Sequence, residues 1–403
     1  MANIAIMGFG TVGSGVFDII RRIPEILKRN ANGEEIVVKH ILDIRDFSDH
    51  ENAGLFTKKF EDILNDSSVS VVVEVMGGLH PAYEFTKELL MSGKSVVTSN
   101  KELVATYGTE LLQLALEKNE NYLFEASVGG GIPVIRPIHQ CLTANRVLRI
   151  AGILNGTTNY ILNEMINKGK TFDDALKDAQ AKGYAEKNPA ADIEGHDACR
   201  KIAILASLAS RRFVDYNNIV TEGIVDISLS DVKYAEAAGC VIKLIGYAEF
   251  AEDDRLYSIV CPMVISKTSP LACVDDVYNA VMVTGDSVGD VMFYGKGAGK
   301  LPTASAVVAD VIDAVKHSER SKKIAWTDVG YNFMISPDEK KFSYFIRTSA
   351  TREKIKEVFD IKQIYDIGID GEIGFITEPV AESEIQKKTE ALGSVLSSIR
   401  VME

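Results

Sequence analysis

The chain opens with the stretch Ile6-Met7-Gly8-Phe9-Gly10-Thr11-Val12-Gly13, and this stretch decides the fold of its amino-terminal part. An apolar strand pattern precedes the glycines, and a helical pattern follows them over residues 12–29. In that context Gly8 allows a tight turn, Gly10 lets a pyrophosphate approach the backbone, and Gly13 lets the helix pack on the strand. The helix N-terminus then offers free amides and a positive dipole end to the phosphates. The predicted cofactor contacts of this turn are Gly8, Gly10, Thr11, Val12 and Gly13.

Strands and helices continue to alternate after this turn. Residues 69–75 are mostly valine, as expected for a parallel strand that is buried on both faces. Further strands are predicted at residues 36–44, 94–98 and 122–126, and helices at residues 81–91 and 103–118. This alternation predicts an α/β fold with an N-terminal Rossmann-type, doubly wound parallel sheet.

The pattern changes after Pro133, where strands and helices mix without strict alternation and predict an α+β domain. Its predicted helices cover residues 158–168, residues 172–182 and a long segment that follows Pro189 and ends near Ser210. A glycine-rich turn, Gly295-x-Gly297-x-Gly299, precedes a strongly helical run at residues 303–317. The polar segment 318–339 that follows is a candidate linker.

The C-terminal residues 340–403 form a separate pattern. Strands are predicted at residues 342–348, 361–369, 372–377 and 395–401, and helices at residues 352–359 and 383–392. The dipeptide Asp370-Gly371 is typical of a hairpin turn between the second and third of these strands. The order is βαββαβ, a recurring compact motif.

Composition excludes several classes of function. The chain has 403 residues and a formal net charge of −13, which makes it a poor electrostatic match for nucleic acid or anionic lipid. The five cysteines form no Cys-x-x-Cys pair, so we expect free thiols in a reducing compartment and no zinc site. No apolar run approaches the roughly 18 residues of a membrane span, and no targeting signal precedes the first strand. We therefore expect a cytoplasmic protein.

The end of the second predicted strand should contact the adenine ribose of the cofactor. It carries Asp43 and Arg45. A carboxylate there favours the free 2′-hydroxyl of NAD, whereas an arginine suits the 2′-phosphate of NADP. Because both residues are present, the sequence predicts NADP or NAD without choosing between them, and one of the two can equally be a surface charge.

A second polar group, Thr98-Ser99-Asn100-Lys101, lies at the carboxyl end of a predicted parallel strand, where ligands bind in open α/β sheets. A lysine at this position can place an ammonium group near the nicotinamide and a substrate carbonyl. The alternative is a solvated lysine at the start of a helix, and by itself that alternative is the stronger one.

A third group consists of Glu186, Asp192, Asp197 and Lys201. Asp197 and Lys201 are four residues apart, so they share one face of a helix. Three carboxylates around one ammonium group suit a substrate that carries its own amino group, while the lysine can donate a proton. The spacing alone slightly favours a simpler interpretation, an ordinary surface ion pair, which contributes little to stability.

These segments together resemble the homoserine dehydrogenase family along essentially the whole chain. The matching pieces are residues 8–13, Val73-Glu74-Val75-Met76-Gly77-Gly78, Thr98-Ser99-Asn100-Lys101, residues 125–133, Gly152-Ile153-Leu154-Asn155-Gly156-Thr157-Thr158-Asn159-Tyr160, residues 183–201, and Gly297-Ala298-Gly299 with Pro302-Thr303-Ala304-Ser305-Ala306. The rival hypotheses are a dehydrogenase of another amino acid, which would not need the third group, and a non-catalytic amino-acid sensor, against which both lysines argue.

The resemblance implies an oxidoreductase of threonine, methionine and isoleucine biosynthesis that reduces L-aspartate 4-semialdehyde to L-homoserine with NAD(P)H. Lys201 would donate the proton to the developing alkoxide, with Lys101 beside it near the nicotinamide. Glu186 and Asp197 would hold the substrate amino group, and Asp192 would orient the set. The implied cofactor contacts outside the glycine turn are Arg45, Asn100, Lys101 and Gly299.

The resemblance also implies a monovalent-cation site for sodium. Its ligands would be the Glu125 carboxyl group and the carbonyls of Val128, Gly130 and Ile132. The implied domains are a dinucleotide-binding domain at residues 1–133 plus 300–320, a catalytic and dimerisation domain at residues 134–299, and an ACT-like domain at residues 340–403.

The ACT-like unit departs from its family pattern. The expected Asp-x-Pro-Gly loop after its first strand is replaced by Ser349-Ala350-Thr351-Arg352. Feedback binding of threonine and a purely oligomerising role are therefore both open for this unit. We expect a homodimer or homotetramer.

Overall fold

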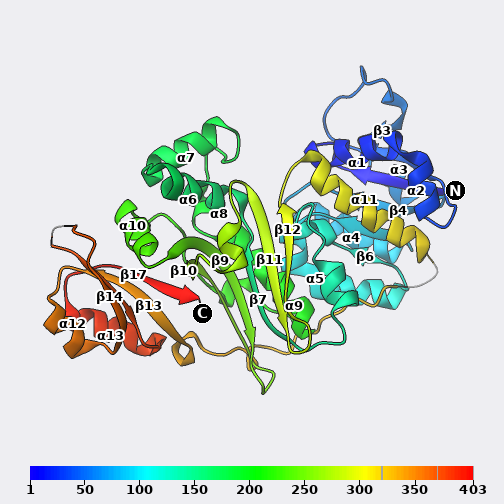
Figure 1. The fold of residues 1–403 in the computed structure, drawn as a ribbon. Coiled ribbons are helices and arrows are strands. Elements are labelled where there is room, and N and C mark those ends of the chain that lie inside the picture. Colours follow the sequence, from blue (N-terminus) through cyan, green and yellow to red (C-terminus); the bar gives the residue numbers. More distant parts are fainter. Residues whose placement is uncertain (319–320, 370, 403) are drawn as a thin grey trace. The chain divides into compact units, whose positions relative to one another are not determined.

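The computed structural model describes residues 1–318, 321–369 and 371–402, and it divides into two compact units (Figure 1). Unit 1 contains Met1–Asn145, Ala203–Tyr216 and Phe293–Val329. Unit 2 contains Arg146–Ile202, Asn217–Met292 and Gly330–Glu403. Because the chain crosses between the units several times, each unit is assembled from segments that are far apart in the sequence.

Unit 1 is built on a parallel sheet with the strand order β3-β2-β1-β4-β5-β6. This is the order of a doubly wound dinucleotide-binding sheet, so the predicted Rossmann-type fold is confirmed. The four residues Val71, Val72, Val73 and Glu74 of β4 are buried, as the valine-rich sequence predicts. The strands are β1 (Ala2–Met7), β2 (Ile36–Leu42), β3 (Phe56–Thr57), β4 (Val69–Glu74), β5 (Ser95–Thr98) and β6 (Tyr122–Leu123).

The prediction of one helix over residues 12–29 is wrong. The structure has α1 and α2 there, separated at Ile23, where φ is −130°. Pro24 starts α2 and lacks the N–H that would continue α1, and it disfavours helical backbone at the residue before it. The helices of unit 1 are α1 (Thr11–Arg22), α2 (Pro24–Asn30), α3 (Glu61–Leu64), α4 (Ala82–Met91), α5 (Lys101–Lys118) and α11 (Lys300–Lys316).

The helix α11 packs on α1, far from it in sequence. A Cβ atom at Gly15 would lie 2.8 Å from the carbonyl oxygen of Lys300 and 2.9 Å from the Cβ of Ala304, so only glycine permits this approach. The Lys300 ammonium also pairs with Asp18 at 2.7 Å. The helix that follows the second glycine-rich turn therefore covers the dinucleotide-binding sheet, as the resemblance implies.

Unit 2 is built on a mixed sheet with the order β12-β11-β7-β9-β10-β17-β13-β15-β14. The strand β12 was not predicted, because its residues lie in a glycine-rich region and are partly or wholly exposed. The strands before the C-terminal motif are β7 (Val147–Ile153), β8 (Val220–Thr221), β9 (Cys240–Phe250), β10 (Leu256–Ser266), β11 (Tyr278–Gly285) and β12 (Gly289–Lys296).

The prediction of one long helix after Pro189 is also wrong in its extent. It is divided into α8 and α9 at Gly195, where φ is +86° and a helix cannot continue. Asp197 and Lys201 both fall on α9, so their helical spacing is retained. The helices of this region are α6 (Gly156–Lys168), α7 (Phe172–Ala181), α8 (Ala190–Ile193), α9 (His196–Ser210) and α10 (Leu229–Ala237).

The C-terminal residues form the predicted βαββαβ order with one added strand of two residues, β16, before the second helix. Antiparallel pairing gives the strand order β17-β13-β15-β14, and β17 also pairs in parallel with β10, which joins this motif to the rest of the sheet of unit 2. Asp370 of the predicted hairpin lies outside the described residues. The elements are β13 (Lys341–Thr348), α12 (Arg352–Val358), β14 (Ile361–Tyr365), β15 (Ile373–Thr377), β16 (Val380–Ala381), α13 (Glu382–Leu392) and β17 (Val395–Met402).

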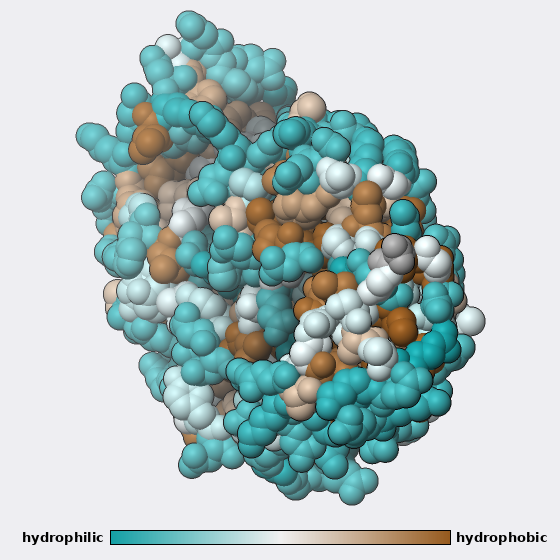
Figure 2. All heavy atoms as spheres, turned by 90° about the vertical axis from the view of Figure 1, so that its left-hand side faces the viewer, coloured by the Kyte–Doolittle hydropathy of each residue, from teal (hydrophilic) through white to brown (hydrophobic). Residues whose placement is uncertain are grey.

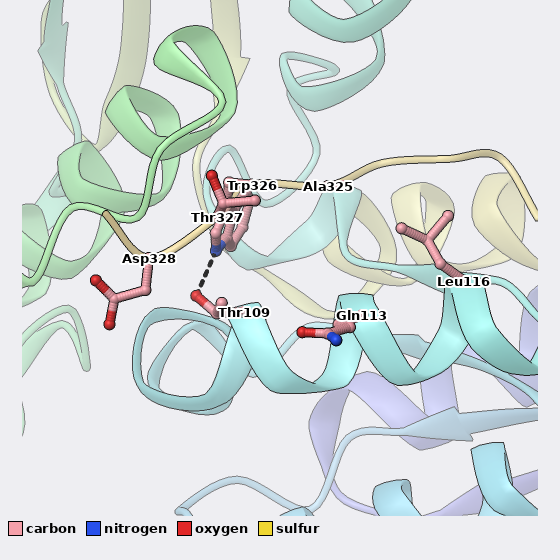
Figure 3. A pocket seen from close by; sticks show the side chains of 7 residues that line it. All are labelled: Thr109, Gln113, Leu116, Ala325, Trp326, Thr327 and Asp328. Atoms are coloured by element: carbon pink, nitrogen blue, oxygen red, sulfur yellow. Dashed lines mark hydrogen bonds between the residues drawn. The ribbon is translucent and has the colours of Figure 1, made fainter. Parts of the chain in front are cut away.

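The candidate linker contains a well-packed segment. Trp326 is only 4% exposed, donates from Nε1 to the Thr109 hydroxyl at 3.0 Å, and contacts α5 where a Cβ at Gly108 would lie 2.7 Å from its ring. The polar composition predicted a linker because one tryptophan hardly changes the average. A pocket of about 340 Å³ lies here and is lined by Thr109, Gln113, Leu116, Ala325, Trp326, Thr327 and Asp328 (Figure 3).

None of the helices in the described residues combines the length and apolar character that crossing a membrane requires.

Candidate active site

The glycine turn between β1 and α1 has the geometry that its sequence predicts. Gly8 has φ +96°, a conformation that favours glycine, and a Cβ at Gly13 would collide with the carbonyl oxygen of Gly8. By contrast, a Cβ at Gly10 would meet nothing within 4 Å. The N-terminus of α1 has no side-chain cap, so its amides are available for an anion. These residues fit the pyrophosphate of a dinucleotide.

The sequence leaves open which of Asp43 and Arg45 contacts the cofactor ribose. In the structure the two side chains have different surroundings. The Asp43 side chain is 7% exposed and accepts hydrogen bonds from the Phe9 amide at 2.7 Å and from the Arg45 guanidinium at 2.8 and 2.9 Å. The Arg45 guanidinium beside Asp43 holds the pKa of that carboxyl well below its usual range. The Arg45 side chain is 56% exposed. Asp43 therefore anchors the glycine turn, while Arg45 faces solvent.

Asn100 lies in a chain of hydrogen bonds at the carboxyl ends of β4 and β5. The buried Glu74 carboxyl group accepts from the Thr98 hydroxyl at 2.6 Å, and this hydroxyl accepts from the backbone amide of Asn100 at 2.9 Å. The Asn100 side-chain amide donates to the carbonyl oxygen of Gly78 at 2.6 Å, and the Met76 backbone amide donates to the Glu74 carboxylate at 2.9 Å. Burial raises the pKa of Glu74. These bonds fix the carboxyl ends of β4 and β5, the edge at which the sequence predicts a ligand.

Lys101 and Gly299 each occupy the start of a helix in unit 1. Lys101 is the first residue of α5, for which Asn100 is the N-cap and accepts from the Leu103 amide at 3.1 Å. Gly299 precedes α11 with φ +121°, a conformation that L side chains rarely adopt. Both residues are thus held by elements of the dinucleotide-binding sheet.

The lysine and carboxylates of unit 2 form a partly buried cluster. The Lys201 ammonium donates to the carbonyl oxygen of Leu154 at 2.7 Å and pairs with Asp197 Oδ2 at 2.8 Å. The Asn155 amide nitrogen donates to Asp192 Oδ1 at 2.7 Å and to Asp197 Oδ2 at 2.9 Å. The Lys201 and Asp197 side chains are only 11% and 10% exposed, so this is no solvated surface pair. Reduced exposure strengthens each charge interaction.

The remaining member of this group, Glu186, is not hydrogen-bonded to the cluster in the described part of the chain. It is exposed, and its backbone carbonyl accepts from Gln180 Nε2 at 3.1 Å. Within the part of the chain that the structure describes, its carboxylate makes no bond to Asp192, Asp197 or Lys201. The structure therefore brings together three of the four predicted residues.

The Glu125 side chain, predicted as a cation ligand, is engaged by backbone amides. Its carboxylate accepts from Val134 at 2.6 Å, Ile135 at 2.7 Å and Arg136 at 2.9 Å, and the backbone amide of Glu125 donates to Asp310 at 2.8 Å. Burial raises the pKa of Asp310 to about 7. The Glu125 carboxylate therefore anchors the turn at residues 134–136.

The carbonyl-bearing loop beside Glu125 is tightly packed. Gly130 has φ +57°, and a Cβ there would collide with the backbone of Gly297. Among the described residues, no group of three or more His, Cys, Asp or Glu side chains is placed to hold a metal ion.

Two residues of this site carried no predicted role. Asn155 and Glu74 belong to segments that the resemblance includes, but no function was attached to either. An asparagine directly before Gly156-Thr157-Thr158 is a typical N-cap signal, and its side chain does accept from the Thr158 amide at 2.9 Å. Its second set of contacts joins residues about 40 positions away, which no local pattern indicates.

A doubly wound parallel sheet headed by this glycine turn, with a lysine–carboxylate cluster in unit 2, defines a dinucleotide-dependent oxidoreductase. Residues 8–125 match the family model described as "Homoserine dehydrogenase, NAD binding domain", and residues 133–312 match "Homoserine dehydrogenase". The chain belongs to the homoserine dehydrogenase family, and it is an oxidoreductase with an NAD-binding domain. Residues 313–403 lie outside both family models.

Similar proteins support the same assignment. A homoserine dehydrogenase from Synechocystis sp. is 44% identical over 320 residues, which cover 78% of this chain and 73% of the relative. One from Neisseria gonorrhoeae is 41% identical over 360 residues, which cover 87% and 82%. The crystal structure of a homoserine dehydrogenase from Thiobacillus denitrificans has a TM-score of 0.91 at 35% identity and covers 100% of this chain and 98% of its own.

A shorter structural relative is a hyperthermophilic archaeal homoserine dehydrogenase in complex with NADPH. It has a TM-score of 0.67 at 30% identity and covers 78% of this chain and 97% of its own.

Proposed function

We propose that the chain catalyses the reversible NAD(P)H-dependent reduction of L-aspartate 4-semialdehyde to L-homoserine, a step of threonine, methionine and isoleucine biosynthesis. The observation that carries the proposal is the largely buried Lys201, whose ammonium is held by the Leu154 carbonyl and the Asp197 carboxylate. When bound, the cofactor supplies the hydride that reduces the aldehyde carbon. Lys201 then supplies the proton to the carbonyl oxygen, which completes the alcohol.

The carboxylates have a different task in this mechanism. Asp197 and Glu186 bind the ammonium group of the substrate. Asp192 orients Asp197 through Asn155, which donates to both of these carboxylates. One lysine among these carboxylates leaves an excess of negative charge, which suits a cationic amino group. Lys101 adds a second positive charge beside the reacting carbonyl oxygen.

The experiment is a direct assay of homoserine oxidation. Purified protein with L-homoserine and NADP or NAD should form reduced nicotinamide, and the reverse reaction should consume it with aspartate semialdehyde. Turnover of L-aspartate in place of L-homoserine would assign another amino acid as substrate. The absence of turnover with either compound would contradict the proposal.

We propose NADP(H) as the preferred cofactor. Asp43 already accepts three hydrogen bonds through the Phe9 amide and the Arg45 guanidinium, whereas Arg45 is exposed and can turn to a 2′-phosphate. Replacing Arg45 with alanine is expected to raise the KM for NADPH by roughly 10- to 100-fold, since a hydrogen bond to a charged group contributes about 1.5–3 kcal/mol. The KM for NADH should change little. The archaeal relative solved with NADPH supports this choice.

A matched control for this variant is Arg21→Ala. Arg21 is also an exposed arginine of unit 1 and pairs with the exposed Glu51. It should leave both KM values unchanged. A lower KM for NADH than for NADPH in the wild type, or equal losses for both cofactors in Arg45→Ala, would reject the preference for NADP(H).

We propose that a monovalent cation, sodium, binds the carbonyl oxygens of Val128, Gly130 and Ile132. Glu125 has another role, because its carboxylate accepts three backbone amides. Exchanging sodium for choline at constant ionic strength should therefore lower the rate. Glu125→Gln should lower the melting temperature without changing the sodium concentration at half-maximal rate. A rate that is equal in both salts would remove the cation from the proposal.

For the C-terminal residues 340–403 we propose an ACT-like unit, supported by the strand order β17-β13-β15-β14. The position of the missing ligand loop is taken by Thr351, which caps α12 by accepting from the Lys354 amide at 3.3 Å. Two roles suit this unit, threonine binding and oligomerisation. A rate that falls with added L-threonine would identify the first.

We further propose three functional domains within the two compact units, at residues 1–133 plus 300–320, 134–299 and 340–403. The five cysteines are free, which supports a cytoplasmic location.

A homodimer or homotetramer is proposed as the working state of the chain. The edge strand β12 exposes Met292 and Tyr294, and apolar side chains gather in groups on the face that Figure 2 turns toward the viewer.

A further inference from the structure

We propose that Asn155 is a positioning residue for the reaction, which holds the two carboxylates of the substrate site at a fixed separation. This inference rests on the proposed function for the roles of Asp192, Asp197 and Lys201. Asn155 lies two residues after the end of β7 at Ile153 and is the N-cap of α6, so its backbone is held between two regular elements. It is only 6% exposed.

The hydrogen bonds of Asn155 use both ends of its side-chain amide. Its oxygen accepts from the Thr158 amide at 2.9 Å, and its nitrogen donates to Asp192 at 2.7 Å and to Asp197 at 2.9 Å. The two donor hydrogens of the amide are thus directed to two carboxylates from different helices, α8 and α9. An amide is the group that can accept on one side and donate twice on the other.

The preceding residue contributes to the same arrangement. The carbonyl oxygen of Leu154 accepts from the Lys201 ammonium at 2.7 Å, and the same Asp197 oxygen that pairs with Lys201 also accepts from Asn155. Leu154 and Asn155 together therefore orient one ammonium group and two carboxylates. The position of Lys201 depends on Asn155 through Asp197.

A neutral donor suits this place for an electrostatic reason. Asp192 and Asp197 lie close enough to share one amide nitrogen, so their charges repel each other. A neutral amide reduces this repulsion without cancelling the negative charge that a substrate ammonium group needs. A lysine or arginine at position 155 would compete with the substrate for the same oxygens.

Two substitutions separate positioning from helix capping. Asp and Ser are N-caps about as good as Asn, so Asn155→Asp and Asn155→Ser retain the cap of α6 but lose the doubly donating amide. If Asn155 positions the carboxylates, both variants should lower kcat/KM for homoserine by roughly 10²-fold, as expected for a misplaced site. The KM for NADP should stay at its wild-type value in both variants. The melting temperature should stay at the wild-type value in Asn155→Ser and fall in Asn155→Asp, because a third carboxylate would repel Asp192 and Asp197. Wild-type kcat/KM in either variant would overturn the inference.

Thr171→Ala is the matched control for capping. Thr171 caps α7 in the same unit, where its hydroxyl accepts from the Asp174 amide at 3.2 Å. This variant should lower the melting temperature and leave kcat/KM unchanged. A double-mutant cycle then tests whether Asn155 acts through the carboxylates. The loss caused by Asn155→Ser should be smaller in an Asp192→Asn background than in the wild type, and fully additive losses would contradict the inference.

Failure of the inference can be distinguished from failure of the proposed function. If the wild type oxidises homoserine and Lys201→Ala does not, while both Asn155 variants retain full activity, the inference alone fails. If the wild type does not oxidise homoserine, the proposed function fails. A crystal structure of Asn155→Ser then tests the inference without activity, because Asp192 and Asp197 should move apart. Unchanged carboxylate positions in that structure would overturn it.

Discussion

Replacing Lys201 with alanine is expected to lower kcat for homoserine oxidation by roughly 10²- to 10⁴-fold, the contribution of a well-placed proton-transfer group. The substitution removes the ammonium group that the Leu154 carbonyl and Asp197 hold. In the reduction direction the oxygen then has neither its proton donor nor the adjacent positive charge. The affinity for NADP should not change, because the glycine turn belongs to another part of the chain. Stopped-flow kinetics and fluorescence titration of the cofactor measure the two quantities.

A matched control removes another lysine of unit 2 that also forms an ion pair with a carboxylate. Lys168 on α6 pairs with Glu164 at 2.7 Å with the same spacing of four residues, but its side chain is 55% exposed. Lys168→Ala should therefore keep the wild-type kcat. A Lys201→Ala variant that turns over like the wild type would end the assignment of Lys201 as proton donor, even if homoserine is the substrate.

The fold could be predicted from the sequence wherever local physics is decisive. The glycine turn, the valine-rich β4 and the βαββαβ order follow from backbone freedom, burial on both faces and regular alternation. The errors lie where one residue overrides a periodic pattern. Pro24 and Gly195 each divide a helix whose apolar spacing runs past them, and Trp326 anchors a segment whose average composition is polar.

The candidate site could be predicted only in part, and the reason is again physical. Asp197 and Lys201 come together because helical spacing places residues four apart on one face. The contact of Asn155 with Asp192 depends on how β7 and α6 pack beside α8, which the sequence of either segment does not encode. The sequence left open whether Asp43 or Arg45 contacts the ribose, and it did not indicate that Asp43 accepts from the Phe9 amide and from Arg45. Tertiary packing determines which of several possible partners such a polar side chain contacts.

The second large effect is expected at the glycine turn of unit 1. An alanine at position 13 would place its Cβ well under the 3.0 Å below which real Cβ contacts essentially do not occur, against the carbonyl oxygen of Gly8. Since this neighbour is backbone, α1 must move away from β1. We expect the free energy of unfolding of unit 1 to fall by about 3 kcal/mol, the upper range for overpacking, together with loss of cofactor binding. Thermal melts with and without NADPH measure both effects.

Gly10→Ala should separate these two effects. Its Cβ would meet nothing within 4 Å, and Gly10 has φ −75°, which alanine adopts readily, so the melting temperature without cofactor should equal that of the wild type. The methyl group would nevertheless stand where the pyrophosphate approaches the backbone, so NADPH should bind more weakly by at least about tenfold, or about 1.4 kcal/mol. The stabilisation by NADPH should shrink accordingly.

Gly54→Ala, also in open space, should change neither the melting temperature nor the affinity for NADPH. If Gly10→Ala binds NADPH as tightly as the wild type, the pyrophosphate does not lie on this turn, and the role of the Gly8–Gly13 segment would be that of a structural turn alone.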